Sequence, residues 1–163
     1  FVDTDMEQFE FVLRLNLVAG LMVPTKVIAK HWIENGVEGS IINLASMSSY
    51  IPLSGVWAYD AAKSAVMNLT MGAAKEFAAQ KIRVNALAPG FFIGKQNKAL
   101  LIDEETGNLT PRGEDVIRHT PAGRFGEVNE LAGATLFLAS NAAAGFVTGV
   151  TLPVDGGYLI DNI

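Results

Sequence analysis

Apolar residues near the start of the chain recur at the spacing of an amphipathic helix, three or four positions apart on one face. They are Phe9, Val12, Leu13, Leu17 and Leu21. Thr4 and Glu7 precede them as a capping box, with Thr4 as the cap residue. We expect one helix from Thr4 to about Asn35-Gly36, with a bend or local break at Pro24.

The rest of the chain alternates between short β-rich runs and longer helical segments. Strands are expected at residues 40–45, 82–87 and 149–153, and helices at 57–79, 110–119 and 127–139. Alternation of this kind builds a parallel sheet covered by helices on both faces. The chain is therefore expected to be an α/β protein, with residues 1–163 belonging to a single domain.

Three strands are few for a parallel sheet, because its hydrophobic edges would stay bare. The order of elements also begins with a helix, as if it joined a strand–helix series in the middle. The first residue is Phe1 and not methionine. We therefore expect the second half of a doubly wound domain, whose first half would precede Phe1.

Composition and charge exclude several classes of protein. Half of the residues are apolar and 18% are charged, which excludes disorder of the whole chain. The net charge of −5 argues against a nucleic-acid partner and is typical of a cytoplasmic protein. The absence of cysteine excludes disulfides, thiolate metal clusters and a cysteine nucleophile.

The apolar stretches of the chain raise the question of whether it spans a membrane. Residues 131–154 carry no charge, but Ser140-Asn141, Gly145 and Gly149 divide them into a helix and a strand. Residues 17–29 contain Pro24 and Lys26 and also make a poor span. We therefore expect no membrane partner and no secretory signal.

Tyr59 and Lys63 carry the first candidate chemistry. They lie four residues apart in the predicted helix 57–79, so they share one face about one turn apart. A phenol has a pKa near 10 and is a poor acid–base catalyst at neutral pH. A lysine ammonium one turn away would stabilise the phenolate and bring its pKa toward the working range.

Other polar residues lie where parallel α/β sheets bind their ligands, at the carboxyl ends of strands. Ser46 ends the strand 40–45, thirteen residues before Tyr59, and could donate to a substrate carbonyl. Pro89-Gly90 closes the next strand. Asn16 lies among apolar residues of the first helix, which indicates either a helix irregularity or a buried polar group with a function.

In combination these residues resemble the short-chain dehydrogenase/reductase family. The family's Asn-Ser-Tyr-Lys tetrad is matched by Asn16, Ser46, Tyr59 and Lys63. Its following strand is matched by Asn85 and Pro89-Gly90, and its C-terminal signature by residues 123–127, 146–149 and 154–157. The resemblance covers about residues 1–158. It implies a Rossmann-type doubly wound fold, a nicotinamide cofactor, and hydride transfer between an alcohol and a carbonyl.

The resemblance implies a role for each matching residue. Tyr59 would be the general acid or base, and Lys63 would lower its pKa and hold the nicotinamide ribose. Ser46 would orient the substrate carbonyl, and Asn16 would hold a water in a proton relay behind Lys63. The nicotinamide would be lined by Pro89, Gly90 and the backbone of Ile93.

Two parts of the family pattern are missing. Residues 91–95 contain no threonine or serine, where many members have a threonine that contacts the cofactor. No glycine-rich phosphate loop follows a strand, so the adenosine and pyrophosphate would bind before Phe1. The residue that selects between NAD and NADP would also precede Phe1. The cofactor is therefore NAD or NADP, with NAD favoured by the resemblance.

The loop 91–126 is similar to that of family members that act on sugar acids, and it implies D-mannonate or its keto form D-fructuronate as substrate. The candidates to meet its carboxylate and hydroxyls are Ser46, Lys95, Gln96, Asn97, Arg112 and Arg118. The two long helices, 4–35 and 57–79, resemble the pair that assembles family tetramers. A homotetramer is therefore expected.

Several alternatives stay open. Tyr59 could be an ordinary half-buried helix tyrosine, and Asn16 could mark only a kink. The protein could be another sugar or polyol dehydrogenase of the same family, similar to gluconate 5-dehydrogenase. It could also be a non-catalytic remnant that serves as a binding or assembly module, or a membrane-associated protein using residues 131–154.

Overall fold

In the part of the chain that the structure describes, three parallel strands form one sheet. The computed structural model describes residues 1–53, 55–94 and 97–161. Within them the strands are β1 (Gly39–Leu44), β2 (Ile82–Pro89) and β3 (Thr151–Val154), in the order β1-β2-β3. Both pairings are parallel, with Ile42 opposite Asn85 and Ala86 opposite Thr151. The α/β class and the parallel sheet are confirmed, and β3 begins at Thr151, two residues later than expected.

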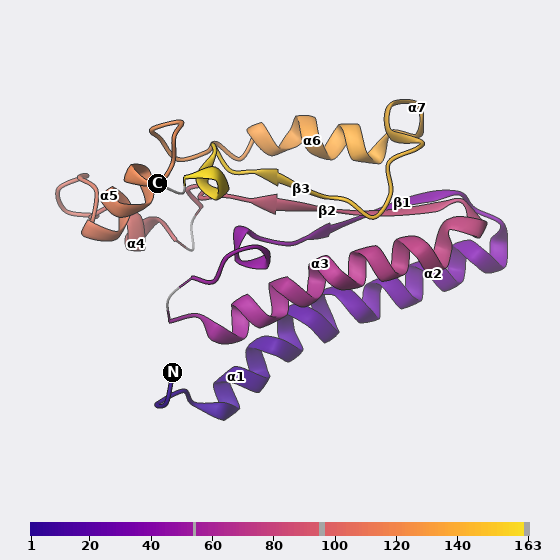
Figure 1. Ribbon diagram of the computed structural model, residues 1–163, viewed down its shortest axis with the longest axis horizontal. Coiled ribbons are helices and arrows are strands. Elements are labelled where there is room, and N and C mark those ends of the chain that lie inside the picture. Colours follow the sequence, from indigo (N-terminus) through magenta and orange to yellow (C-terminus); the bar gives the residue numbers. More distant parts are fainter. Residues whose placement is uncertain (54, 95–96, 162–163) are drawn as a thin grey trace.

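Helices cover both faces of the sheet. Helix α3 (Trp57–Phe77) packs against β1 and β2 from one side, and α6 (Glu130–Ala139) packs against all three strands from the other. Figure 1 shows the three arrowheads pointing to the same end of the molecule. The shorter helices α4 (Lys98–Leu101) and α5 (Pro111–Arg118) lie at that end, beyond the carboxyl ends of the strands.

The first helix is continuous but changes its winding. It consists of α1 (Met6–Leu13), a π-helical segment (Arg14–Met22) and α2 (Val23–Asn35), and it ends at Gly36 in a left-handed conformation. The expected irregularity therefore lies before Pro24. Pro24 itself occupies the first turn of α2. The wide π turns suit a proline, because it lacks the N–H that an α-helix would use there.

Two helix starts differ from expectation. Asp5, not Thr4, caps α1 by accepting from the backbone N–H groups of Glu7 and Gln8, while the Thr4 hydroxyl donates to Phe1. Helix α6 begins at Glu130 and not at residue 127. The Glu130 carboxylate accepts from the Glu127 backbone N–H at 2.8 Å, which holds the preceding residues in a turn.

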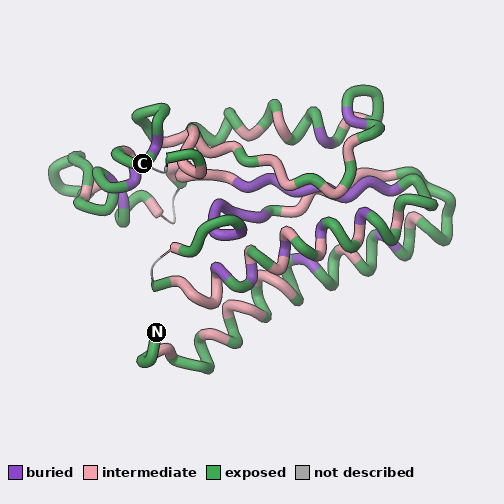
Figure 2. The backbone as a smooth tube through the Cα atoms, viewed as in Figure 1, coloured by how far each residue is buried: buried purple, intermediate pink, exposed green. Residues whose placement is uncertain are grey.

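The core lies between the sheet and α3. Strand β2 is buried along nearly its whole length, as Figure 2 shows by its colour. Leu21 and Val66 pack there against the small side chains of Ala45, Ala86 and Ala88. Small residues on the strands let α3 and the first helix approach the sheet closely.

The outer side of the first helix is largely exposed. The helix Met6–Asn35 is long and apolar enough to cross a membrane by length and composition alone, and 6% of its most apolar window is buried. Residues 131–154, the stretch weighed from the sequence, instead divide into α6, the short helix α7 (Asn141–Ala144) and β3.

Candidate active site

Ser46 lies just after the end of β1 and begins a turn, residues 46–50, within the connection from β1 to α3. It is buried and caps a short 3-10 helix, Met47–Ser49. Its Oγ accepts from the Ser48 backbone N–H at 3.2 Å. The Ser49 hydroxyl donates to the carbonyl of Lys63 at 2.5 Å, which ties this turn to α3. Because its Oγ already accepts, the Ser46 hydroxyl hydrogen is left to donate to another group.

Tyr59 and Lys63 lie in the first two turns of α3, on one face as the spacing predicted. The Lys63 Nζ lies 5.4 Å from the centre of the Tyr59 ring and donates to the carbonyl of Leu44 at 2.8 Å. Partial burial lowers the pKa of Lys63 below its ordinary value. The structure therefore places an ammonium group against the Tyr59 ring and joins it to the end of β1.

Asn16 belongs to the π-helical segment, and its side-chain amide donates to the carbonyl of Val12 at 3.0 Å. It lines a cavity of about 340 Å³ together with Lys63, Asn43, Leu44 and other residues. Asn16 therefore lies in a helix irregularity, which is one of the two alternatives that the sequence left open. The same residue also borders the cavity that contains Lys63, so the irregularity and the proposed role behind Lys63 are compatible.

Pro89 ends β2, and Gly90 follows it beside the loop after β3. A side chain at Gly90 would place its Cβ 2.6 Å from the Cα of Asp155, so this close approach requires glycine. The Asp155 carboxylate accepts from the backbone N–H groups of Gly157 and Leu159. Ile93 follows in the same loop and is partly buried. The backbone at 89–93 is thus held at the carboxyl end of the sheet.

Asn85 of β2 holds the loop that precedes β3. Its amide is fully buried, donates to the carbonyl of Val147 at 2.9 Å and accepts from the backbone N–H of Val150 at 3.2 Å. Both polar groups of the side chain are therefore used to hold the loop before β3 against the central strand.

The substrate candidates of the loop 91–126 have different surroundings. Lys95 and Gln96 lie outside the described residues. The Asn97 amide donates to the carbonyl of Phe92 and accepts from the Gly94 N–H, both at 2.8 Å, so it closes its own loop. Arg118 forms an ion pair with Asp115 on the same helix. Of the candidates named in this loop, Arg112 has no ion pair among the described residues.

Sequence reasoning missed the partnership of Arg124 and Glu130. The guanidinium donates two hydrogen bonds, of 2.6 and 2.7 Å, to the two carboxylate oxygens. The pair holds the turn that contains Gly126, which forms a bridge with Phe92. Bidentate geometry of this kind is specific to arginine. An arginine followed six residues later by a glutamate that opens a helix was the available signal.

The ion pair between Arg124 and Glu130 leads to a testable prediction about the pKa of Glu130. The hydrogen bonds from Arg124 and from the Glu127 N–H lower the pKa of Glu130 to about 2. Because the pKa of Glu130 is lower in the folded state, the ion pair contributes fully to folding stability above the unfolded-state pKa of about 4.3. This contribution is lost as the pH falls through about 2. Carboxyl NMR titration of Glu130 should show this low midpoint. In Arg124→Gln it should move upward; an unchanged midpoint there would contradict the assignment.

Sequence reasoning also missed the contact of Tyr50 and two buried polar side chains that lack hydrogen-bond partners among the described residues. The Tyr50 hydroxyl donates to the carbonyl of Thr151 at 2.9 Å and so joins the Ser46 turn to β3. Asp60, next to Tyr59, is only 8% exposed, and neither carboxylate oxygen has a hydrogen-bond partner among the described residues. The buried Ser48 hydroxyl is likewise unpartnered there. The described residues contain no cluster of metal ligands.

Comparison with known proteins gives this geometry a context. Residues 1–159 match a family model described as enoyl-(acyl carrier protein) reductase. An uncharacterised oxidoreductase of Haemophilus influenzae is 46% identical over 159 residues, which are 97% of this chain and 54% of the relative. The 2-dehydro-3-deoxy-D-gluconate 5-dehydrogenase of Bacillus subtilis is 40% identical, over 96% of this chain and 58% of the relative.

Solved structures of similar proteins support the same family. One from Haemophilus influenzae, assigned provisionally as a D-mannonate oxidoreductase and containing NAD, has 45% identity and a TM-score of 0.90, covering 98% of this chain and 56% of that one. A gluconate 5-dehydrogenase from Burkholderia cenocepacia, in complex with NADP and tartrate, has 38% identity and a TM-score of 0.85, covering 99% and 59%. The chain thus spans about half the length of these relatives. It belongs to the short-chain dehydrogenase/reductase family and corresponds to the C-terminal portion of its members.

Proposed function

We propose that this chain supplies the catalytic half of an NAD(P)-dependent oxidoreductase that interconverts a hydroxyl and a keto group on a sugar acid. The observation that carries the proposal is the position of Lys63, which lies beside the Tyr59 ring and is hydrogen-bonded both to the end of β1 and to the turn that carries Ser46. The names of the similar proteins, a D-mannonate oxidoreductase and dehydrogenases of gluconate derivatives, support the sugar-acid class.

In this mechanism Ser46 positions the reacting oxygen. Its Oγ accepts from the Ser48 N–H, so its own hydrogen can be donated to the carbonyl oxygen of the substrate. The link between Ser49 and the Lys63 carbonyl keeps this turn at a constant place relative to α3. Such preorganisation orients the carbonyl without cost at the moment of reaction.

Tyr59 gives its phenolic proton to the same oxygen during reduction and takes it back during oxidation. The Lys63 ammonium, 5.4 Å from the ring centre, stabilises the phenolate that remains. Asn16 and Lys63 border one cavity, which could hold the water that returns the proton to Tyr59.

The residues present also fit the nicotinamide half of the cofactor. The Lys63 Nζ has one described acceptor, the Leu44 carbonyl, and so keeps donors for the ribose hydroxyls. Pro89, Gly90 and the backbone of Ile93 would lie along the nicotinamide ring. When bound, the nicotinamide supplies or accepts the hydride. Both NAD and NADP occur in similar structures, and NAD is favoured here because it occupies the D-mannonate oxidoreductase relative.

The test is an assay of the complete natural protein with D-mannonate, D-gluconate and their keto forms, each with NAD and NADP. We expect turnover of at least one sugar acid, with D-mannonate and D-fructuronate preferred. Turnover of gluconate alone would favour the second candidate, a gluconate 5-dehydrogenase, which similar proteins of that name support. No turnover of any sugar acid would contradict the proposal and favour a non-catalytic module.

We further propose that two copies pack through the first helix in a cytoplasmic homotetramer and that the helix does not cross a membrane. Its exposed apolar side chains, Phe11, Leu15, Val18 and Met22, lie on the helix that packs against α3. Burying them against a second copy would remove this apolar surface from water.

Val18→Arg should therefore dissociate the assembly, because it places a charge within the buried surface. Sedimentation velocity would show the smaller species. Lys30→Gln is the matched control, since it changes a side chain that forms only an exposed ion pair with Glu34. An unchanged sedimentation coefficient for Val18→Arg would argue against this interface.

A further inference from the structure

An ion pair closes the turn that leads into α6. The Arg124 guanidinium donates to both carboxylate oxygens of Glu130, at 2.6 and 2.7 Å, and to the carbonyl of Phe125 at 3.0 Å. Glu130 also accepts from the Glu127 backbone N–H at 2.8 Å. The two ends of the turn, residues 124 and 130, are therefore joined by side-chain hydrogen bonds.

This turn contacts the segment that follows β2. The Gly126 backbone N–H donates to the carbonyl of Phe91 at 2.9 Å, and Gly126 and Phe92 form a parallel bridge. The Phe92 ring lies against Gly126, where a Cβ would overlap with it. The turn therefore acts as a short strand-like partner for residues 91–92, directly after the end of β2.

The same segment also bonds to the end of β3. The Gly90 backbone N–H donates to the carbonyl of Val154 at 2.9 Å. A small cavity of about 100 Å³ remains between these pieces of chain, and its lining includes Phe91, Phe92, Arg124, Glu130 and Asp155. The backbone at 90–92 is thus held both by the end of β3 and by the turn that the ion pair closes.

The ion pair lies at the surface and not in the core. The side chains of Arg124 and Glu130 are 56% and 42% exposed. An ion pair with this exposure contributes little to folding stability. Its two parallel hydrogen bonds nevertheless fix the distance and orientation between the two residues. The pair therefore sets the position of the turn more than it stabilises the fold.

We infer that the ion pair between Arg124 and Glu130 positions the backbone against which the nicotinamide ring binds. The inference rests on the proposed function, in which residues 89–93 line that ring. A segment without regular secondary structure keeps a defined shape only where its backbone is bonded, and the turn supplies such a bond through Gly126. Arg124 and Glu130 are positioning residues, since they act through Gly126 and not by contact with the nucleotide.

The test compares two ligands that differ only in the nicotinamide. The reduced nucleotide that the complete natural protein prefers and the corresponding ADP-ribose are titrated calorimetrically into that protein and its variants. Arg124→Gln should weaken binding of the reduced nucleotide by about fivefold to tenfold and leave ADP-ribose binding unchanged. A general loss of structure would weaken the binding of both ligands alike.

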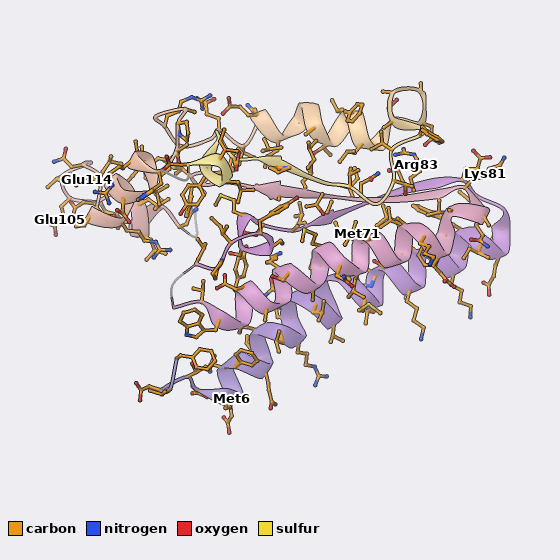
Figure 3. The ribbon with its side chains drawn as sticks, in the orientation of Figure 1. Met6, Met71, Lys81, Arg83, Glu105 and Glu114 are labelled. Carbon is orange, nitrogen blue, oxygen red and sulfur yellow. The ribbon has the colours of Figure 1, made fainter. Side chains whose placement is uncertain are left out.

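Further variants assign the effect to the ion pair. Glu130→Gln should give the same selective loss, and combining it with Arg124→Gln should add nothing, because either change alone removes the pair. Arg124→Lys keeps the charge without the fork and should restore part of the affinity. Lys81→Gln is the matched control, since it removes a 2.6 Å ion pair with Glu38 at the opposite end of β2 (Figure 3).

Hydrogen exchange of the ligand-free protein measures the position of the turn without any nucleotide. The Gly126 N–H, which donates to the Phe91 carbonyl, should exchange faster in Arg124→Gln than in Lys81→Gln. Equal exchange in the two variants would contradict the inference.

The binding outcomes separate this inference from the proposed function. If Arg124→Gln binds the reduced nucleotide as tightly as the natural protein, or loses affinity for both ligands equally, the inference is overturned and the proposed function stands. If the loss is selective for the reduced nucleotide but no sugar acid is turned over, the positioning role stands and the proposed reaction fails.

Discussion

Replacing Tyr59 with phenylalanine should lower kcat of the complete enzyme by about three orders of magnitude, the size of a lost general acid–base catalyst. The substitution removes one oxygen and keeps the ring that lies beside the Lys63 ammonium. Nucleotide affinity should change little, because the Lys63 Nζ and the loop after β2 remain. Steady-state kinetics and fluorescence titration with reduced nucleotide measure the two quantities separately.

Tyr50→Phe is the matched control for Tyr59→Phe. It also removes a phenolic oxygen near the site, but that oxygen donates to the Thr151 carbonyl and joins the Ser46 turn to β3. We expect only a small part of the kcat loss, together with a lower unfolding temperature. If Tyr59→Phe kept most of the natural kcat, or if both variants lost activity equally, Tyr59 would not be the proton donor.

The parts of the site that depend on local spacing could be predicted from the sequence. Tyr59 and Lys63 share a face because four residues make about one helical turn, and no glycine or proline interrupts α3 between them. Ser46 was identifiable because a short β-rich run bounded by Gly39 ends beside it. These inferences needed only the periodicity of one element at a time.

The winding of the first helix could not be predicted in the same way. A π-helical segment adds residues to a turn without changing which residue types are apolar, so the pattern reads as one regular helix. Pro24 signals an interruption, but it lies within the first turn of α2 and therefore marks only where the π-helical segment has ended. The cap at Asp5 was ambiguous because Thr4 and Asp5 are both good acceptors.

Contacts within the irregular loops were also beyond sequence reasoning. Asn97 was a reasonable substrate ligand by residue type, yet the structure uses its amide within residues 92–97. The pairing of Arg124 with Glu130 depends on a turn that periodicity does not describe. Without its partners in three dimensions, a polar loop residue cannot be assigned to substrate or to structure.

The largest stability effect is expected at Arg83, a buried cation that holds the end of α6 on the sheet. It is 7% exposed, and its guanidinium donates to the carbonyl of Leu138 at 2.9 Å and to the side chain of Asn141 at 2.9 Å. Ser40, opposite Arg83 in β1, donates to the same Leu138 carbonyl. A positive charge at a helix C-terminus is also favoured by the helix dipole.

Arg83→Met keeps much of the aliphatic length but removes the guanidinium donors to the Leu138 carbonyl and the Asn141 side chain, leaving Ser40 as the remaining donor to Leu138. We expect the free energy of unfolding to fall by about 3 kcal/mol, as measured by urea titration of tryptophan fluorescence. Lys81→Met is the matched control, because Lys81 lies at the same end of the molecule and pairs with Glu38 only at the surface (Figure 3). Its effect should be small.

Arg83→Lys separates charge from hydrogen bonding. Lysine keeps the charge near the end of α6, but its single nitrogen cannot reach Leu138 and Asn141 with the geometry of the guanidinium. An intermediate loss would show that the fork itself holds α6 and α7 to the sheet. If Arg83→Met and Lys81→Met destabilised the protein equally, the buried hydrogen bonds of Arg83 would contribute no more than a surface ion pair, and the anchor would have to lie elsewhere, with Ser40 as the next side chain to test.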